Sequence, residues 1–407
     1  MLINKLKNIL PNIDRDYPKD FQTIIHNIYS NSELDDEKVQ FIWNAYLFSQ
    51  NAHKNQKRKS GKPYFTHCSS VGVTLSQWKM DSKTIAAGLL HDVIEDTDAT
   101  RLDIVEKFGN EVAELVDGVS KLSGIKFSSR MEKQAENFMK MFLSVAKDLR
   151  VIIIKFADRL HNMSTIQHLP LIKQRRIAVE TRDVYAPLAH RLGMNRLKIE
   201  LEDLVLKTLE PNEYKNLQKK IKATRKQREK YIEEFAKPIN IELTEFNIRS
   251  EIKGRAKHYY SILGKMKSRN KTFEELFDLF AIRITVEKIE ECYTVLGVIH
   301  QLYTPHQERF KDYIATPKSN GYQSIHTTVF GPEGKMVEVQ IRTFDMDQTA
   351  EIGVAAHWLY KEKGSIKNKD NDIDRHMRWL RELVEVLQSE ESDPDEFLKL
   401  LKVDLFK

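Results

Sequence analysis

The pattern of apolar residues changes along this chain, and that change limits the folds open to it. From residue 1 to about 205, apolar residues recur at spacings of three and four, as in DEKVQFIWNAYLFSQNAH, which predicts an all-α domain of many short helices. From 241 to 365, segments rich in β-branched and aromatic residues, such as LFDLFAIRITV and MVEVQIRTF, alternate with helical ones. This part predicts an α+β domain built on a mixed β-sheet.

Two charged segments flank the predicted α+β domain. Residues 206–240 carry many charges and few apolar anchors, which predicts a helical connector between the domains. The basic residues of the connector could contact RNA, although a solvated helix face explains them more simply. Residues 366–407 predict a polar loop and a C-terminal amphipathic helix, whose apolar pattern stops at LKVDLFK without a terminating turn.

Composition narrows the class of protein further. With 407 residues the chain exceeds one ordinary core, and its net charge of +6 suits a pocket for phosphorylated small molecules without requiring nucleic acid. No stretch reaches the ~20 apolar residues that cross a bilayer, and the first residues lack a secretory pattern. Cys68 and Cys292 are the only cysteines. We therefore expect a cytoplasmic protein with no membrane partner.

Four potential metal ligands lie in or beside apolar helical patterns of the first half. His67 lies in KPYFTHC, His91 and Asp92 begin HDVIED, and Asp158 closes VIIIKFAD. Buried acids and imidazoles are unfavourable without a compensating cation. One His–Asp pair would be explained by a buried hydrogen bond, but the three-part set predicts a site for a divalent metal such as manganese or iron. Such an ion activates water and neutralises phosphate oxygens, which predicts a phosphohydrolase.

The second half places two carboxylates on predicted strands. Asp278 lies in FDLFAIRI and Glu338 in VEVQIRT. Two acids at the mouths of neighbouring strands can hold Mg²⁺ together with substrate phosphates. For either strand alone, an exposed sheet face with ordinary charges is the better interpretation. The co-occurrence of both acids with basic loops favours a magnesium site.

Basic, small and aromatic residues near these strands are typical of a nucleotide site. Tyr322 follows an Asn–Gly turn that can present its ring for base stacking. The positive groups suited to a triphosphate are Arg309, Lys311, Lys318 and His326. The residues at a predicted strand-to-helix transition, where phosphate can bind, are Gly254, Arg255, Lys257 and Ser261.

Several segments together resemble one protein family. RKSGKPYFTH, LLHDVIEDTD, VDGVSKL, FADRLHNM and YAPLAHRLG resemble the hydrolase domain of the RelA/SpoT homologues, bacterial enzymes of the stringent response that make and destroy the alarmones ppGpp and pppGpp. The second half resembles the nucleotidyltransferase-like synthetase domain of that family, and the similarity runs from about residue 40 to the end. It implies the catalytic N-terminal half of a bifunctional enzyme, with a regulatory region absent.

The resemblance implies roles for residues of the first half. His67, His91, Asp92 and Asp158 match the family's Mn²⁺ ligands, in a site that hydrolyses (p)ppGpp to GDP or GTP plus pyrophosphate. The other matching residues are the water-activating Glu95 and Asp96, the guanine-holding Arg58, Lys59 and Ser60, and Asn162 and Thr165 near the ribose and phosphates. Cys68 stands where the motif often has proline.

The resemblance likewise implies transfer of the β,γ-pyrophosphoryl group of ATP to the 3′-hydroxyl of GDP or GTP. Asp278 and Glu338 would serve Mg²⁺, with Glu338 the candidate base, while Tyr322 would stack on guanine and Arg255 on adenine. The remaining implied nucleotide-binding residues are Gly254, Lys257, Ser261, Arg309, Lys311, Lys318, Asn320, His326 and Gln340. The basic RFKD segment has the sequence found in bifunctional members of the family. Ala256 stands where the family frequently has proline.

Two alternatives stay open from the sequence. Only one of the two activities could be live, or the chain could be a non-catalytic nucleotide- or RNA-binding regulator. Contacts to the ribosome or tRNA are expected only through the absent C-terminal region. Because opposed reactions on one chain would consume ATP to no purpose, we expect the connector and the flanks of the two sites to couple them.

Overall fold

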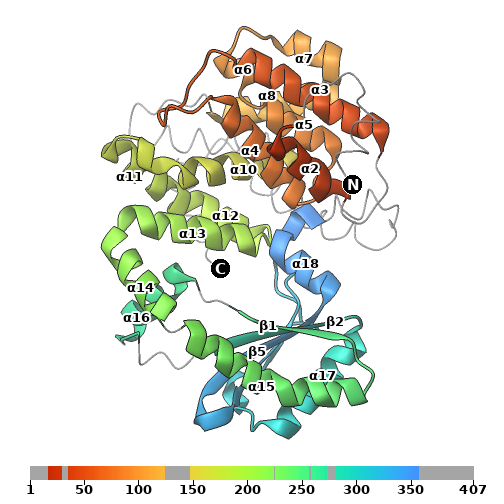
Figure 1. Ribbon diagram of the computed structural model, residues 1–407, viewed down its shortest axis with the longest axis vertical. Helices are drawn as coiled ribbons and strands as arrows, with labels where there is room; N and C mark the ends of the chain where they lie inside the picture. The colour runs from red at the N-terminus through yellow and green to blue at the C-terminus, as the bar shows by residue number, and fades with distance from the viewer. Residues whose placement is uncertain are drawn as a thin grey trace, which may run out of the picture. The chain divides into compact units, whose positions relative to one another are not determined.

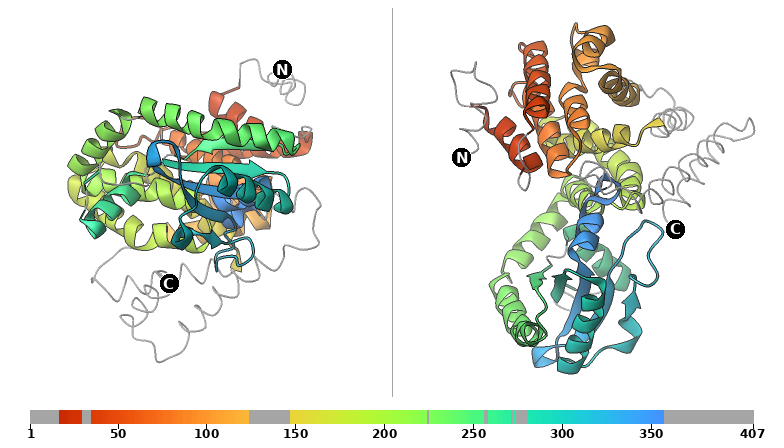
Figure 2. Two further views of the ribbon diagram at one scale, coloured as in Figure 1. Left: turned by 90° about the horizontal axis from the view of Figure 1, so that it is seen from below. Right: turned by 90° about the vertical axis from the view of Figure 1, so that its right-hand side faces the viewer.

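The computed structural model describes residues 17–29, 35–123, 147–223, 225–255, 258–270, 272–273 and 280–356. The chain divides into two compact units, Met1–Leu171 with Val354–Lys407, and Ile172–Gly353. In Figures 1 and 2 the helices of the first unit run from red to yellow, and the sheet of the second from green to blue. The two units are described separately below.

The described part of the first unit is helical. Its helices are α2 (Lys19–Tyr29), α3 (Asp36–Ala52), α4 (Phe65–Gln77), α5 (Ser82–Leu90), α6 (Val93–Asp96), α7 (Arg101–Phe108), α8 (Asn110–Ser123), α10 (Arg150–Ser164) and η1 (Ile166–His168). Asp81 caps α5 by accepting a hydrogen bond from the Thr84 amide (2.9 Å). A Cβ atom on Gly88 would lie 2.2 Å from Leu75 Cδ1, so glycine permits the close packing of α5 on α4.

The helix expected through HDVIED is interrupted. Helix α5 ends at Leu90, and His91 and Asp92 form a turn before the short helix α6. His91 Nδ1 lies 2.8 Å from the carbonyl of Gly88. In a continuous helix that carbonyl would accept from the amide of residue 92, so the imidazole competes with the helical hydrogen bond.

The second unit combines helices with one sheet. Its helical elements are α11 (Leu171–Glu180), η2 (Thr181–Tyr185), α12 (Ala186–Arg191), α13 (Asn195–Leu209), α14 (Pro211–Ala223), α15 (Arg225–Glu245), α16 (Tyr259–Arg269), α17 (Ile289–Leu302), η4 (Gln307–Arg309), η5 (Pro332–Gly334), α18 (Phe344–Ile352) and η6 (Gly353–Ala355), the last reaching into the first unit. Most of the predicted connector forms α14 and α15, and residue 224 lies outside the described residues.

The sheet has five strands in the order β1-β2-β5-β4-β3. They are β1 (Ser250–Gly254), β2 (Phe280–Val286), β3 (Lys311–Asp312), β4 (Ile325–Phe330) and β5 (Met336–Thr343). Strands β2 and β5 are parallel, and the other neighbours are antiparallel. The predicted mixed sheet is therefore confirmed.

One face of the sheet is apolar and covered by helices. Ile282 and Ile284 of β2 and Val339 of β5 lie in one buried cluster with Phe235 of α15 and Val295 of α17. Figure 1 shows α15 and α17 beside this face. The alternating residues between them, Arg283, Glu338, Gln340 and Arg342, belong to the opposite face. The charged segment 206–240 thus contributes apolar residues to the core of the second unit.

No helix in the described ranges is both long enough and apolar enough to cross a membrane. This finding agrees with the absence of a bilayer-length apolar stretch in the sequence.

Replacing Phe235 by alanine should destabilise the protein. Its ring is fully buried and stacks on Tyr303 with centroids 4.4 Å apart. We expect F235A to lower the free energy of unfolding by about 3–5 kcal/mol, because a cavity replaces the ring. In the matched control, F246A removes a ring that is 56% exposed and should change stability by less than about 0.5 kcal/mol. Equal effects in urea denaturation would contradict the assignment of α15 to the core.

Candidate active sites

Three segments of the first unit bring the predicted metal ligands together. His67 lies on α4, His91 and Asp92 form the turn after α5, and Asp158 lies on α10. All four side chains are buried. His67 Nε2 lies 3.2 Å from Asp158 Oδ1 and 3.6 Å from Asp92 Oδ2. The helix contacts of α4 with α5 and α10 thus gather residues that are up to 91 positions apart in the sequence (158 minus 67).

The donor atoms have the spacing that one metal ion requires. Divalent ions lie about 2.0–2.2 Å from nitrogen and oxygen ligands, so the ligand atoms of one ion must lie close to one another. Ligand atoms of His67, His91 and Asp158 all lie within 4.8 Å of one another. His91 Nε2 is buried, lies 3.1 Å from Asp92 Oδ2 and lacks a partner with hydrogen-bonding geometry. Once this atom loses its proton, its lone pair is available to a cation.

Neighbouring groups hold both imidazoles in the tautomer that a metal needs. His91 Nδ1 lies 2.8 Å from the Gly88 carbonyl, which can only accept, so in the neutral ring Nδ1 keeps its proton and Nε2 has the lone pair. His67 Nδ1 lies 2.7 Å from His161 Nδ1. Burial lowers the pKa of His161 to about 3, so that ring is neutral and can accept a hydrogen bond from His67 Nδ1–H. These residues fit a divalent cation.

Positive groups balance the buried acids. Burial lowers the pKa of His91, but without a bound cation the carboxylates of Asp92 and Asp158 outweigh burial and raise this pKa to about 9, so a metal ion would displace a proton from Nε2. Burial raises the pKa of Asp158, but the Lys155 ammonium, 2.6 Å from Asp158 Oδ2, outweighs it and holds the pKa well below its usual value. Both acids are thus anionic, and the site demands positive charge.

The predicted acidic pair lies next to this cluster. Partial burial of its carboxyl group, followed by the charge of Asp92, raises the pKa of Glu95 to about 7. A carboxylate with this pKa can accept and return a proton near neutral pH. The Tyr64 hydroxyl lies 2.7 Å from Asp96 Oδ2 and 2.8 Å from Asp92 Oδ2, and its one proton can be donated to either. Tyr64 therefore links the metal-ligand set to the acidic pair.

The predicted guanine-holding loop is a tight turn before α4. The Arg58 amide donates to the Lys62 carbonyl (2.9 Å), and Gly61 has a φ of +83°, which favours glycine. Arg58 NH2 donates to Asn162 Oδ1 (2.7 Å), and Asn162 Nδ2 donates to Asp158. Arg58 is thereby tied to a predicted metal ligand.

The remaining predicted residues of this site lie more peripherally. Lys59 is exposed and Ser60 is half-buried on the same turn. The Thr165 hydroxyl donates to the His161 carbonyl of its own helix (3.0 Å), so its role near a ribose stays a prediction.

Four residues near the cluster received no role from the sequence. They are Tyr64, Lys155, His161 and Cys68. A lysine inside VIIIKFAD and a histidine in LHNM were visible signals, because both interrupt apolar patterns. Only tertiary packing places the buried Cys68 sulfur within 4.8 Å of donor atoms of His91 and Asp92.

The second predicted site occupies the polar face of the sheet. Glu338 and Gln340 of β5 pair with Thr328 and His326 of β4, and Gln340 Nε2 donates to Glu338 Oε1 (2.8 Å). The Tyr322 hydroxyl lies 2.8 Å from His326 Nε2. Burial, together with nearby cations, lowers the pKa of His326 to about 4. The ring is therefore neutral at pH 7, in contrast to the positive group expected from the sequence.

Positive groups flank Tyr322. Lys318 Nζ lies 4.6 Å from the ring centroid of Tyr313 and 5.3 Å from that of Tyr322. Arg342 Cζ lies 5.9 Å from the Tyr322 ring. Lys311 is exposed on β3, and Arg309 ends η4. The structure thus brings Lys318, Tyr322 and His326 together beside Glu338.

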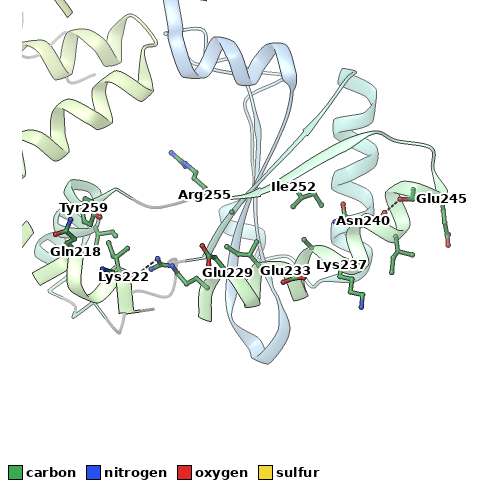
Figure 3. A pocket seen from close by; sticks show the side chains of 18 residues that line it. Gln218, Lys222, Glu229, Glu233, Lys237, Asn240, Glu245, Ile252, Arg255 and Tyr259 are labelled. Atoms are coloured by element: carbon green, nitrogen blue, oxygen red, sulfur yellow. Dashed lines mark hydrogen bonds between the residues drawn. The ribbon is translucent and has the colours of Figure 1, made fainter. Parts of the chain in front are cut away.

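Gly254 and Arg255 lie at the end of β1. The Arg255 amide donates to the Ala281 carbonyl (2.7 Å), and a Cβ atom on Gly254 would lie 2.6 Å from Ile232 Cδ1. A cleft of 1510 Å³ between α14, α15, β1 and α16 includes both residues in its lining. Figure 3 shows Arg255 extending away from the α15 side chains. Ser261 is exposed on α16.

Two predicted residues of the second site, Asp278 and Lys257, lie outside the described residues. The distance between Asp278 and Glu338, and hence a shared magnesium site, stays a prediction.

A partly buried charge cluster beside this face was not assigned from the sequence. Arg283 NH1 contacts Asp347 Oδ1 (3.0 Å) and Glu351 Oε1 (2.9 Å), and Arg342 Nε donates to Asp347 Oδ1 (2.7 Å). The two acids are four positions apart on α18, the spacing of one helix face. The cluster ties α18 to strands β2 and β5.

Comparisons with known proteins also divide the chain into two parts. Residues 45–195 match the HD domain family, and residues 254–365 match the family described as the region found in RelA/SpoT proteins. A Myxococcus xanthus protein named GTP pyrophosphokinase is 49% identical over 374 residues, which are 91% of this chain and 49% of that protein. The chain belongs to the RelA/SpoT homologues. The predicted family is confirmed, and so is an all-α HD-type part followed by an α+β part.

A second curated relative gives the same family. The Escherichia coli (strain K12) protein named bifunctional (p)ppGpp synthase/hydrolase SpoT is 48% identical over 373 residues, 92% of this chain and 53% of that protein. The chain thus spans about half the length of the curated relatives it matches. Small alarmone synthetase 1 from Bacillus subtilis, solved bound to its product pppGpp, matches with 23% identity and a TM-score of 0.29, covering 42% of this chain and 95% of that one.

The Tyr64 hydroxyl should stabilise the protein measurably. Y64F removes a donor to two carboxylates and should lower the free energy of unfolding by about 1–3 kcal/mol, because a buried acceptor loses its partner. Tyr293→Phe is the matched control, since that hydroxyl also donates to a carboxylate, Asp312, but on a side chain that is 41% exposed. Its cost should be below about 0.5 kcal/mol. Equal costs in urea denaturation would contradict a stabilising contact between the Tyr64 hydroxyl and the buried Asp92.

Proposed function

We propose that this chain is a bifunctional alarmone enzyme. It would hydrolyse ppGpp or pppGpp at the 3′-pyrophosphate, giving GDP or GTP plus pyrophosphate. It would also transfer the β,γ-pyrophosphoryl group of ATP to the 3′-hydroxyl of GDP or GTP, with AMP as the leaving group. The observation that carries the proposal is the buried His67, His91 and Asp158 cluster, in which His91 Nε2 has no hydrogen-bond partner among the described residues. The names of the relatives support both activities.

The hydrolytic step would use the acids beside the cluster. A divalent ion held by His67, His91, Asp92 and Asp158 would supply charge for the phosphate oxygens and acidify a bound water. Glu95, with its pKa near 7, would accept the proton of the attacking water and return one to the leaving pyrophosphate. The Tyr64 hydroxyl would hold Asp96 in position for this transfer.

We propose Mn²⁺ for this first site. Two imidazoles and two carboxylates form a mixed donor set, which suits a borderline divalent ion better than Mg²⁺, whose sites are dominated by oxygen ligands and water. The guanine base would lie against Arg58, Lys59 and Ser60, with Asn162 and Thr165 near the ribose and phosphates. Arg58 already has a fixed direction through its hydrogen bond to Asn162.

The synthetic step would take place on the polar face of the sheet. Glu338 would accept the proton of the 3′-hydroxyl as it attacks the β-phosphate of ATP, and Mg²⁺ would bind Glu338 with Asp278. Tyr322 would stack on guanine, and Arg255 on adenine. The proposed phosphate- and nucleotide-binding groups are Gly254, Lys257, Ser261, Arg309, Lys311, Lys318, Asn320, His326 and Gln340. The placement of Lys318, Tyr322 and His326 near Glu338 supports this arrangement.

We further propose hydrolase and synthetase domains at 1–205 and 241–365, with 206–240 as connector and 366–407 as a C-terminal helix. The packing of α15 in the sheet core indicates that the connector folds together with the synthetase part. We also propose a cytoplasmic location, since Cys68 and Cys292 are both buried free thiols.

Single substitutions should separate the two activities. D92N should reduce ppGpp hydrolysis by about a thousandfold, because several kcal/mol of transition-state stabilisation depend on the ion. E338Q should reduce synthesis from ATP and GDP by about a hundredfold or more, through loss of a general base. Chromatography of the nucleotides measures both reactions.

The controls for this separation are D98N and E333Q, which change exposed acids close in sequence to Asp92 and Glu338. Both should leave both activities intact. Loss of both reactions in either D92N or E338Q would contradict two independent sites. Binding without turnover in the unaltered protein would instead support the non-catalytic regulator.

Metal addition should stabilise the first unit. Mn²⁺ at about 100 times its Kd should raise the free energy of unfolding by about 2.7 kcal/mol, because only the folded site binds the ion. Thermal unfolding with and without Mn²⁺ measures this shift. In D158N the shift should disappear, while D98N should keep it. A larger shift with Mg²⁺ than with Mn²⁺ would contradict the assignment of the ion.

A further inference from the structure

The loop Lys318–Tyr322 is held closed by its own backbone and by one side chain. The Gly321 amide donates to the Lys318 carbonyl (2.9 Å), and the Lys318 amide donates to the Tyr322 carbonyl (3.2 Å). Asn320 is buried within it. Asn320 Oδ1 accepts from the Tyr322 amide (3.3 Å), while its Nδ2 donates to the His190 carbonyl (3.1 Å). Asn320 thus ties Tyr322 to the end of α12.

Two buried glycines meet the loop at the same place. Gly193, in the turn after α12, has a φ of +73°, and a Cβ atom there would lie 3.1 Å from the Asn320 carbonyl oxygen and 3.3 Å from Gly353 Cα. Gly353, directly after α18, has a φ of +56°. A Cβ atom there would lie 2.4 Å from the Leu192 carbonyl oxygen and 2.5 Å from the Met194 amide nitrogen. Three backbone segments therefore touch without intervening side chains.

A second tether holds α13 against α18 next to this junction. Asn195 Nδ2 donates to the Ala350 carbonyl (3.2 Å), one turn before Gly353. Its Oδ1 lies 3.3 Å from His190 Nδ1. Figure 1 shows α13 beside α18, which in turn is bound to the sheet by Arg283 and Arg342. The turn is thus connected to the strands that carry Glu338.

We infer that the turn Leu192–Met194 positions the loop Lys318–Tyr322 for binding of the acceptor guanine nucleotide. The close contacts of Gly193 and Gly353 hold this turn against the loop. The inference rests on the proposed function of Tyr322 in stacking on guanine. Gly193 and Gly353 are positioning residues, because they act on the nucleotide through Asn320 and Tyr322. The turn falls within the residues that match the HD domain family, yet it belongs to the same compact unit as the sheet.

Displacement of the turn Leu192–Met194 should affect the binding of GDP alone. Arg255, the proposed adenine partner, lies at the end of β1, whose described neighbours are β2 and α15. Displacing the turn Leu192–Met194 should therefore weaken GDP binding and leave ATP binding unchanged. A role in folding alone would affect both nucleotides alike.

The test compares three glycine substitutions in the whole chain. In G353A a Cβ atom must displace backbone atoms, and G193A repeats the change with milder contacts. Gly334 is the matched control, because it also has a positive φ (+66°) but nothing within 4 Å of its Cβ position. Calorimetric titration with GDP gives Kd, steady-state synthesis gives KM for GDP and for ATP, and thermal unfolding reports stability.

We expect G353A to raise the Kd and KM for GDP by about tenfold, equivalent to ~1.4 kcal/mol of binding free energy. G193A should raise both by a smaller factor, and KM for ATP should stay unchanged in each variant. G334A should match the unaltered protein in GDP binding while sharing the loss of stability that a positive φ imposes on alanine.

Unchanged GDP binding in G193A and G353A, or equal losses for GDP and ATP, would overturn the inference. If G353A does not fold, G193A alone carries the comparison with G334A. If the unaltered protein does not bind GDP, the proposed function itself fails. This result is distinct from the case in which the protein binds GDP but the turn does not position the loop.

Discussion

Two buried carboxylates, Asp92 and Asp158, set the strongest physical constraint on the first unit. Helices α4, α5 and α10 pack closely around them, so water cannot solvate their charge. In response, Lys155 pairs with Asp158, and the pKa of His91 rises to about 9. The same helices that bury the acids also place His67 and His91 at ligand spacing. Packing and metal binding are therefore two results of one arrangement.

The second unit depends on the two faces of one sheet. Its apolar face is covered by α15 and α17, which leaves the alternating residues of β4 and β5 to form a polar face. Alternation along the strands places His326, Glu338 and Gln340 together on the polar face. The burial of the apolar face therefore determines which side chains line the proposed synthetase site. Helix α18 is tied to the sheet by Arg283 and Arg342, so the end of the helix at Gly353 has a defined position.

Much of the fold followed from periodicity, and some features did not. The all-α first half, the mixed sheet and the strands around Arg283 and Glu338 agree with the patterns of apolar residues. The break of the helix at His91 was not visible, because it depends on a side-chain hydrogen bond to Gly88 that competes with the backbone. The neutral state of His326 was also not visible, since it results from burial and neighbouring cations contributed by distant segments.

By itself, the sequence determined which chemical groups the protein has and the order in which they occur. Apolar periodicity marked the helices and strands, and the embedded His–Asp segments pointed to a metal site, because both signals are local along the chain. Only the tertiary structure decided which groups meet. Examples are the contacts of His161 with His67, of Tyr64 with two acids, and of Gly193 with Gly353. In each case the separation of the residues in sequence does not predict their distance in space. Such contacts arise from the packing of whole helices and strands, which no local pattern encodes.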